Sequence, residues 1–114
     1  MTQSNVNAVL NSDAKGYWIV LADINNLTRF VQYTSRAGPL IASYGGRVLA
    51  RGDVAEAVEG DISGKPYLIE FPNYAAAREC FHSPGYQDAI ALRVGVAKFQ
   101  IIIAQGFLPA GTNV

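Results

Sequence analysis

Hydrophobic and polar positions follow two periods along this chain, and they predict strands and helices in turn. Gly16–Asp23, GYWIVLAD, is apolar on both of its faces, which is typical of a strand covered on both sides. From Asn26 to Gly45 apolar residues recur at helical spacing, and the final glycine can end a helix in a left-handed conformation. Pro39 is expected to bend or interrupt that helix near Ala37 and Gly38.

The second half of the chain predicts further strands and two short helices. Gly46–Arg51 and Val54–Gly60 are predicted as two strand pieces joined by a turn, and Pro66–Phe71 as the next strand. Asn73 is expected to cap a helix that runs through Phe81. Ser83 and Pro84 have the residue types of a second helix start.

The closing strand is predicted to begin at about Lys98. The element order is therefore βαββαβ, which predicts an α+β, ferredoxin-like fold with a four-stranded antiparallel sheet and helices on one face. Residues 15–108 are expected to form this one domain, with 1–14 as a flexible N-terminal arm and 109–114 as a C-terminal tail.

Helices on one side of the sheet leave a second apolar face without cover. We expect that face to carry Trp18 and Val20, or else Tyr17 and its neighbours at alternate positions. A second copy of the chain is the simplest cover, so the pattern predicts a homodimer through the face carrying Trp18 or Tyr17. The alternative is a monomer whose sheet is covered by the N-terminal arm.

Composition excludes several classes of function. Nine basic residues balance nine acidic ones, so the electrostatic field that attracts nucleic acids or anionic membranes is missing. No segment has the roughly 18 apolar residues of a membrane span, and the first 15 residues lack the pattern of a secretory signal. We therefore expect a cytoplasmic protein with no nucleic-acid or membrane partner.

The single cysteine and single histidine lie two positions apart in the segment CFHSPGY, residues 80–86. Residues two apart on a helix point in different directions, which argues against a Cys80–His82 catalytic pair. Cys80 is instead interpreted as a buried small hydrophobic residue. The spacing of Cys and His offers no metal site, and the glycines form no nucleotide-binding motif, so neither a metal nor a cofactor is expected.

Several ordered motifs together resemble one known family. The segments are YGGRVLARGD, VEGD, YLIEFPNYAAAREC, SPGYQDAIALR and IIIAQGF. They are similar to the domain-of-unknown-function 1330 family, and the resemblance runs from about Gly16 to Phe107. It implies a ferredoxin-like subunit of the dimeric α/β-barrel superfamily, in which two sheets pack face to face. Ser83, Pro84 and Tyr86 match the family motif, whereas Gly85 stands where a glutamate is often found.

Five residues are candidates for a ligand site. Alternation predicts that Arg47, Leu49 and Arg51 share one side of their strand and that Glu70 lies on the neighbouring strand, where an arginine can pair with it. His82 and Tyr86 are expected to approach from the helix restart. The predicted ligand-binding set is Arg47, Arg51, Glu70, His82 and Tyr86.

Three functions remain open on the sequence. The leading hypothesis is a small cytoplasmic homodimer that binds a small anionic or enolisable organic molecule between sheet and helices. The first alternative is a cofactor-free monooxygenase, isomerase or lyase of the dimeric α/β-barrel type, with His82 or Glu70 as base. The second alternative is a structural or regulatory dimer without a ligand.

Overall fold

The computed structural model describes residues 9–108. The predicted tail, 109–114, and the first eight residues of the predicted arm lie outside the described residues. Residues 9–14 lie beside the end of the last strand, where the Asn11 backbone N–H donates to Gln105 Oε1 at 2.7 Å. Ala14, just before the first strand, is buried.

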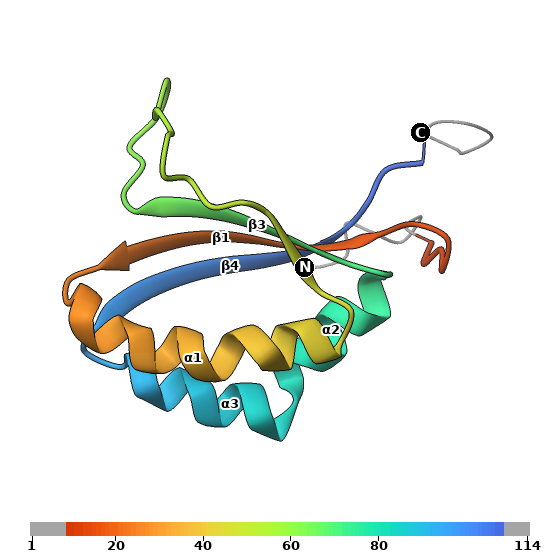
Figure 1. Cartoon of the computed structure of the whole chain (residues 1–114). Coiled ribbons are helices and arrows are strands. Elements are labelled where there is room, and N and C mark those ends of the chain that lie inside the picture. Colours follow the sequence, from red (N-terminus) through yellow and green to blue (C-terminus); the bar gives the residue numbers. More distant parts are fainter. Residues whose placement is uncertain (1–8, 109–114) are drawn as a thin grey trace, which may run out of the picture.

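A four-stranded antiparallel sheet forms one layer of the molecule, and helices cover one of its faces (Figure 1). The strands are β1 (Gly16–Ile24), β2 (Arg47–Ala50), β3 (Lys65–Phe71) and β4 (Ala97–Gln105). Their order across the sheet is β2-β3-β1-β4. This arrangement confirms the predicted ferredoxin-like fold.

The helical layer consists of α1 (Leu27–Ser43), α2 (Tyr74–His82), α3 (Pro84–Ile90) and a short 3₁₀ turn, η1 (Ala91–Arg93). Side-chain oxygens cap the helices as predicted. Asn73 accepts from the Ala76 N–H at 2.8 Å, and Ser83 accepts from the Tyr86 N–H at 3.1 Å. Each cap satisfies a backbone donor that the first turn of a helix leaves without an intrahelical partner.

Of the two predicted effects of Pro39, the interruption is wrong, because α1 continues through it to Ser43, and the bend stays a prediction. Proline removes one backbone donor from the helix. Leu40 and Ile41, the next two residues, pack against the hydrophobic core, so tertiary contacts hold the final turn in the helical conformation. The helix then ends as expected, with Gly45 at a φ of 79°.

The predicted strand piece Val54–Gly60 is also wrong. These residues belong to the long β2–β3 loop, in which Val54 is fully exposed. The loop stands away from the sheet on the side opposite the helices (Figure 1). A strand needs a neighbour for its backbone hydrogen bonds, and both edges of β3 are already occupied by β2 and β1.

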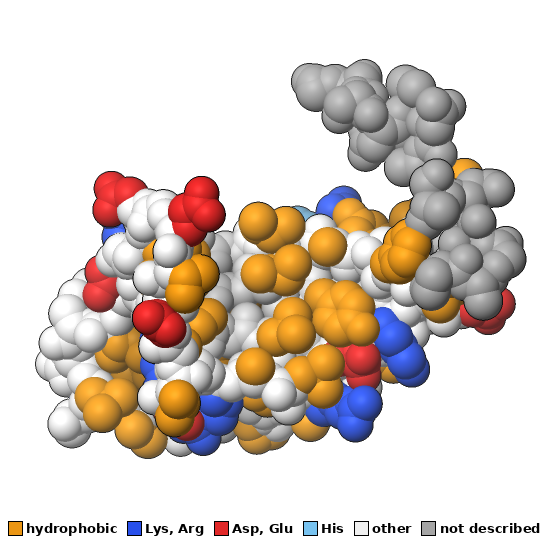
Figure 2. Space-filling view, turned by 90° about the horizontal axis from the view of Figure 1, so that it is seen from above, with side chains coloured by type: hydrophobic (Ala, Val, Ile, Leu, Met, Phe, Trp, Pro, Cys, Tyr) orange, Lys and Arg blue, Asp and Glu red, His pale blue; other side chains and the backbone are white. Residues whose placement is uncertain are grey.

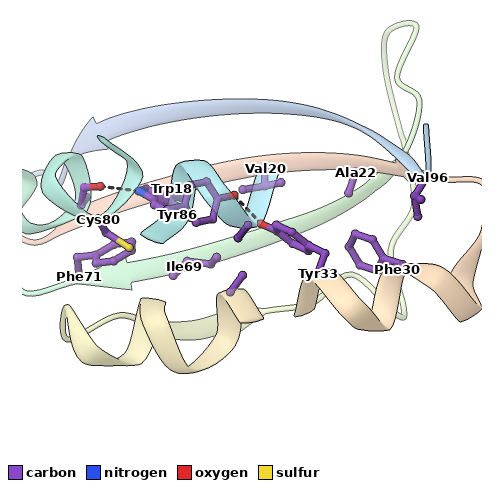
Figure 3. Packing of buried hydrophobic residues seen from close by; sticks show 13 residues of the cluster. Trp18, Val20, Ala22, Phe30, Tyr33, Ile69, Phe71, Cys80, Tyr86 and Val96 are labelled. Carbon is purple, nitrogen blue, oxygen red and sulfur yellow. Dashed lines mark hydrogen bonds between the residues drawn. The ribbon is translucent and has the colours of Figure 1, made fainter. Parts of the chain in front are cut away.

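The core lies between the sheet and the helices, and Trp18 is at its centre (Figure 3). The side chain is 1% exposed, its Nε1–H donates to the Ala77 carbonyl at 2.8 Å, and its ring packs against Phe71, Phe81 and Tyr86. The prediction that placed Trp18 on the uncovered face is therefore corrected. By alternation along β1, the uncovered face is the one that carries Tyr17 and Ile19.

Cys80 lies in this core, as the sequence predicted, and its side chain is fully buried. Burial raises the pKa of its thiol to about 11. The thiolate is the reactive form of cysteine, so both access and ionisation oppose its modification.

We therefore expect native Cys80 to react with a thiol reagent at pH 7 at least about a hundredfold more slowly than in the urea-unfolded chain, because labelling must wait for local opening. The rate is measured by absorbance or mass spectrometry. A matched control is Ser35→Cys, at an exposed position of α1, in a Cys80→Ala background. Equal rates for the two thiols in the folded proteins would contradict the buried assignment.

Candidate functional site

A cleft of about 370 Å³ lies between α1 and the helix-covered face of the sheet. It exists because α1 packs mainly against α3 and η1, whereas α2 packs against β1, β3 and β4. The part of the sheet nearest β2 is therefore left partly open, and Val48 is 51% exposed there. Aromatic and aliphatic side chains form most of the wall, among them Trp18, Phe30, Phe99 and Ile101.

Two tyrosines from different helices meet in the wall of this cleft. Tyr33 comes from α1 and Tyr86 from α3, and their hydroxyl oxygens are 2.5 Å apart (Figure 3). Tyr33 is 5% exposed and Tyr86 is fully buried. Burial and the neighbouring Tyr86 hydroxyl raise the pKa of Tyr33 well above its usual range, so it carries its proton at neutral pH.

Arg93 of η1 brings a positive charge to the same pair. Its Nη2 donates to the Tyr86 hydroxyl at 3.4 Å, and its Cζ lies 3.9 Å from the centroid of the Phe99 ring. Its Nε is buried and has no hydrogen-bond partner among residues 9–108. Within the same range no carboxylate forms an ion pair with Arg93. The guanidinium is held instead by aromatic stacking and by one hydroxyl.

Arg51 and Lys65 supply the cationic groups that line the cleft at the start and the end of the β2–β3 loop. Lys65 Nζ lies 2.6 Å from Asp53 Oδ1, and Arg51 Nε lies 3.7 Å from Asp53 Oδ2. The hydrogen bond between Lys65 and Asp53 raises the pKa of the lysine and lowers that of the carboxyl. The Asp53 carboxylate thus pairs with two cations, and N–H donors of Arg51 and Lys65 remain that could bind a ligand.

Arg47 and Glu70 lie on the opposite, uncovered face of the sheet. Arg47 reaches Glu70 Oε1 through both Nε and Nη2 at 3.0 Å, and the Tyr17 hydroxyl donates to Glu70 Oε2 at 3.0 Å. The sequence predicted that an arginine would pair with Glu70, and Arg47 does so. Both partners lower the pKa of the Glu70 carboxyl.

Arg47 and Arg51 do not share a face, contrary to the prediction from alternation. The β2–β3 pairing is irregular at Leu49: Val48 is opposite Ile69, but Ala50 is opposite Leu68. Such a bulge adds one residue to a strand and reverses the direction of every later side chain. Arg51 therefore lines the cleft, while Arg47 faces away from it.

His82 lies at the end of α2, is exposed, and has its Nε2 at 3.4 Å from Arg78 Nη1. The five predicted ligand-binding residues thus do not converge: Arg51 and Tyr86 line the cleft, Arg47 and Glu70 pair on the other face, and His82 lies apart from both. A ligand role for Arg47, Glu70 and His82 stays a prediction.

The sequence analysis missed Tyr33, Lys65 and Arg93 as polar groups of this region. Tyr33 lies at helical spacing from the buried residues Phe30 and Ala37, which is the signal that could have identified it. Arg93 lies seven residues after Tyr86, the spacing of two helical turns, and a charged residue at that distance from a core-facing tyrosine is the usable signal.

Residues 9–108 contain no group of three or more His, Cys, Asp or Glu side chains placed to hold a metal ion. None of the helices in this range is long and apolar enough to cross a bilayer.

The fold is similar to several solved structures. RPA0582 from Rhodopseudomonas palustris, a protein of unknown function, is 19% identical with a TM-score of 0.64, and the match covers 85% of each chain. SnoaB, a cofactor-independent oxygenase from Streptomyces nogalater, is 10% identical with a TM-score of 0.56, over 87% of this chain and 99% of that one.

A dimeric ferredoxin-like protein of unknown function from Thermobifida fusca is 12% identical, with a TM-score of 0.56 over 86% of this chain and 99% of that one. No curated protein matches the sequence. The model of the family described as "Domain of unknown function (DUF1330)" matches residues 15–107. The match spans the whole ferredoxin-like unit, from β1 to just beyond β4, and the chain therefore belongs to the DUF1330 family.

Proposed function

We propose that this chain is a homodimeric protein that binds a small organic molecule in the cleft between α1 and the sheet. The observation that carries the proposal is the cleft itself: about 370 Å³, walled by aromatic and aliphatic side chains, with a few polar groups. Small-molecule sites usually combine these features, since apolar walls supply binding energy and a few polar groups fix orientation.

The charges of the lining favour an anionic or enolisable ligand. Arg51 and Lys65 line the cleft, and none of the described lining residues is an aspartate, a glutamate or a histidine. Asp53 offsets part of this positive charge from the adjacent loop. A ligand cation would find no lining carboxylate, whereas a carboxylate or enolate oxygen would find guanidinium and ammonium donors.

Binding has more support than catalysis. SnoaB acts as a cofactor-independent oxygenase, but at 10% identity the similarity to it extends to the fold alone. Chemistry on an activated carbonyl compound needs a general base within reach of the ligand. The two predicted bases, His82 and Glu70, are both outside the described lining of the cleft.

The proposed dimer would form through the uncovered face of the sheet. Figure 2 shows hydrophobic side chains gathered in the middle of this face. Ile19 of β1 is 45% exposed, and its neighbour on β4, Ile102, is 63% exposed. A contiguous apolar surface of this kind is characteristic of an interface, and a two-fold axis can place the same surface of a second copy against it. The neighbour from Thermobifida fusca is described as dimeric.

The β2–β3 loop would flank the second copy, because it projects on the same side as the uncovered face (Figure 1). Val54 is fully exposed and Val58 is 81% exposed on this loop. Removing such exposed apolar side chains from water by contact with a partner lowers the free energy of the complex. The loop is therefore expected to extend the interface beyond the sheet.

We expect the parent protein to sediment as a dimer at micromolar concentration and Ile19→Asp to sediment as a monomer, because the substitution would bury a charge in an apolar interface. Val94→Asp is the matched control, since Val94 is 72% exposed and lies just after η1, in the helical layer. It should leave the mass unchanged. A monomeric parent at this concentration would remove the proposed dimer.

For the ligand site, we expect 2-naphthoate to raise the melting temperature of the parent more than 2-naphthylmethylammonium does, because the lining cations favour an anion. Arg51→Ala and Lys65→Ala should each weaken naphthoate binding by about threefold to tenfold, the effect of one partly screened ion pair. Arg78→Ala on α2 is the control and should bind as the parent does. Equal stabilisation by the cation would contradict the charge argument.

The Arg47–Glu70–Tyr17 contact predicts a pH dependence of stability. The folded-state pKa of Glu70 is lower than its ordinary value of 4.5, so the folded state binds the proton less readily than the unfolded chain does. The stabilisation is present above about pH 5 and is lost as the pH falls through the folded-state pKa. In urea unfolding at fixed protein concentration, Glu70→Gln should therefore be less stable than the parent at pH 7.

That difference in the free energy of unfolding should shrink as the pH falls from about 5 toward about 3, because protonation removes the same charge in the parent. Glu59→Gln, at an exposed position of the β2–β3 loop, is the control. The difference in the free energy of unfolding between Glu59→Gln and the parent should be small and should not change with pH in this way. A Glu70→Gln effect of the same size at both ends of the range would show that the carboxylate charge is not the stabilising feature.

A further inference from the structure

The Tyr33 and Tyr86 hydroxyls, together with the Arg93 guanidinium beside them, have one more hydrogen-bond donor than they can satisfy among themselves. Arg93 Nη2 donates to the Tyr86 hydroxyl, and the Tyr33 and Tyr86 hydroxyls share one hydrogen bond whose donor is either tyrosine. If Tyr33 donates, the Tyr86 proton has no acceptor. If Tyr86 donates, the Tyr33 proton has none. In both cases one hydroxyl proton remains without an acceptor among residues 9–108.

Tyr33 is the member of the pair that a ligand can reach, because it is 5% exposed whereas Tyr86 is fully buried. Both tyrosines line the cleft, and the arrangement in which Tyr86 donates to Tyr33 leaves the Tyr33 proton for a ligand. A buried donor without an acceptor costs free energy, which an acceptor atom on a ligand would recover. The cleft therefore favours a molecule with a hydrogen-bond acceptor directed toward these hydroxyls.

Arg93 strengthens this preference. Its guanidinium contacts the Tyr86 hydroxyl and no carboxylate forms an ion pair with it in the described part of the chain, so its charge favours electron-rich atoms at the hydroxyl pair. Burial and the neighbouring Tyr86 hydroxyl raise the pKa of Tyr33, so Tyr33 keeps its proton at neutral pH and can donate it in a hydrogen bond. Stacking on Phe99 holds the guanidinium in place.

We propose that Tyr33 and Tyr86 form an oxygen-binding pair, positioned and polarised by Arg93, which receives the carbonyl oxygen, or the corresponding enolate oxygen, of a ring-containing ligand. The inference rests on the proposed binding function and names its ligand class: an apolar ketone or its enol form. Tyr33 contacts the oxygen, Tyr86 donates to Tyr33, and Arg93 acts through Tyr86 as a positioning residue. Any acidic group of the ligand would be taken by Arg51 and Lys65.

The test compares two flat probes of nearly equal shape, 9-fluorenone and fluorene, which differ by one carbonyl oxygen. Affinities are measured by titration with the full-length parent, Tyr33→Phe, Tyr86→Phe and the double variant. The double variant should bind fluorenone about fivefold to tenfold more weakly and fluorene within about twofold of the parent, the effect of one lost hydrogen bond. Tyr74→Phe, which alters a tyrosine of α2 outside the lining, is the matched control and should change neither affinity.

The frequency of the infrared carbonyl stretching band of bound fluorenone is a second readout. It responds to hydrogen bonding at the oxygen, which a purely structural role of the tyrosines would not change. In the parent it should lie below its position in hexane, as a hydrogen-bonded carbonyl does, and it should return toward that position in the double variant. Arg93→Met should reduce the shift while leaving fluorene affinity within about twofold, and Arg93→Lys should restore part of it, because the charge returns.

The outcomes separate this inference from the binding function on which it rests. If 2-naphthoate binds the parent but neither of these probes does, the oxygen-binding pair is wrong and the binding function stands; if none of the three binds, both fall. If both bind but the ratio of their affinities is the same in the double variant, the oxygen-binding pair is wrong and the apolar cleft remains a binding site. If the double variant does not fold, the parent's carbonyl band decides: a band at the hexane position overturns the proposal, and a lowered band that persists in Tyr33→Phe does so as well.

Discussion

The packing of Trp18 under the helices is the constraint on which the rest of this structure depends. Its indole N–H is bonded to the Ala77 carbonyl of α2, and its ring meets Phe71, Phe81 and Tyr86. Side chains alternate along a strand, so placing Trp18 inward sends Tyr17 and Ile19 outward. One aromatic anchor thus decides which face of the sheet is core and which is left for a partner.

The same anchor positions the polar pair of the cleft. Tyr86 packs edge-on against Trp18, and the Ser83 hydroxyl caps the turn from which Tyr86 starts. Tyr33 of α1 then meets Tyr86 from the other side. Because α1 rests on α3 and η1 more than on the sheet, the space beneath it stays open and both tyrosines lie in its wall. The cleft is a consequence of how the helical layer is assembled.

The charged groups are separated by the two faces of the sheet. Arg47, Glu70 and Tyr17 form a hydrogen-bonded group on the uncovered face, whereas Arg51 and Lys65 line the cleft. A single bulge at Leu49 makes this separation, since without the extra residue Arg51 would share the face of Arg47. Dimerisation and ligand binding, as proposed, would therefore use different arginines on opposite sides of one sheet.

The sequence by itself determined the order of the four strands and the helices, the helix caps at Asn73 and Ser83, and the burial of Cys80, although it also predicted a strand at Val54–Gly60 that does not form. These features depend on local periodicity and capping, which neighbouring residues specify. Family membership also followed from ordered motifs along the chain, and the family match over residues 15–107 confirms it.

Only the tertiary structure decided which face of β1 is inward, where β2 changes register, and which polar groups meet. A period of two shows which residues share a face but not which face is buried, because that choice depends on helices far along the chain. Tyr33 and Tyr86 are 53 positions apart, and no local pattern relates them. Their pairing requires α1 and α3 to lie side by side, and that packing is a property of the assembled core.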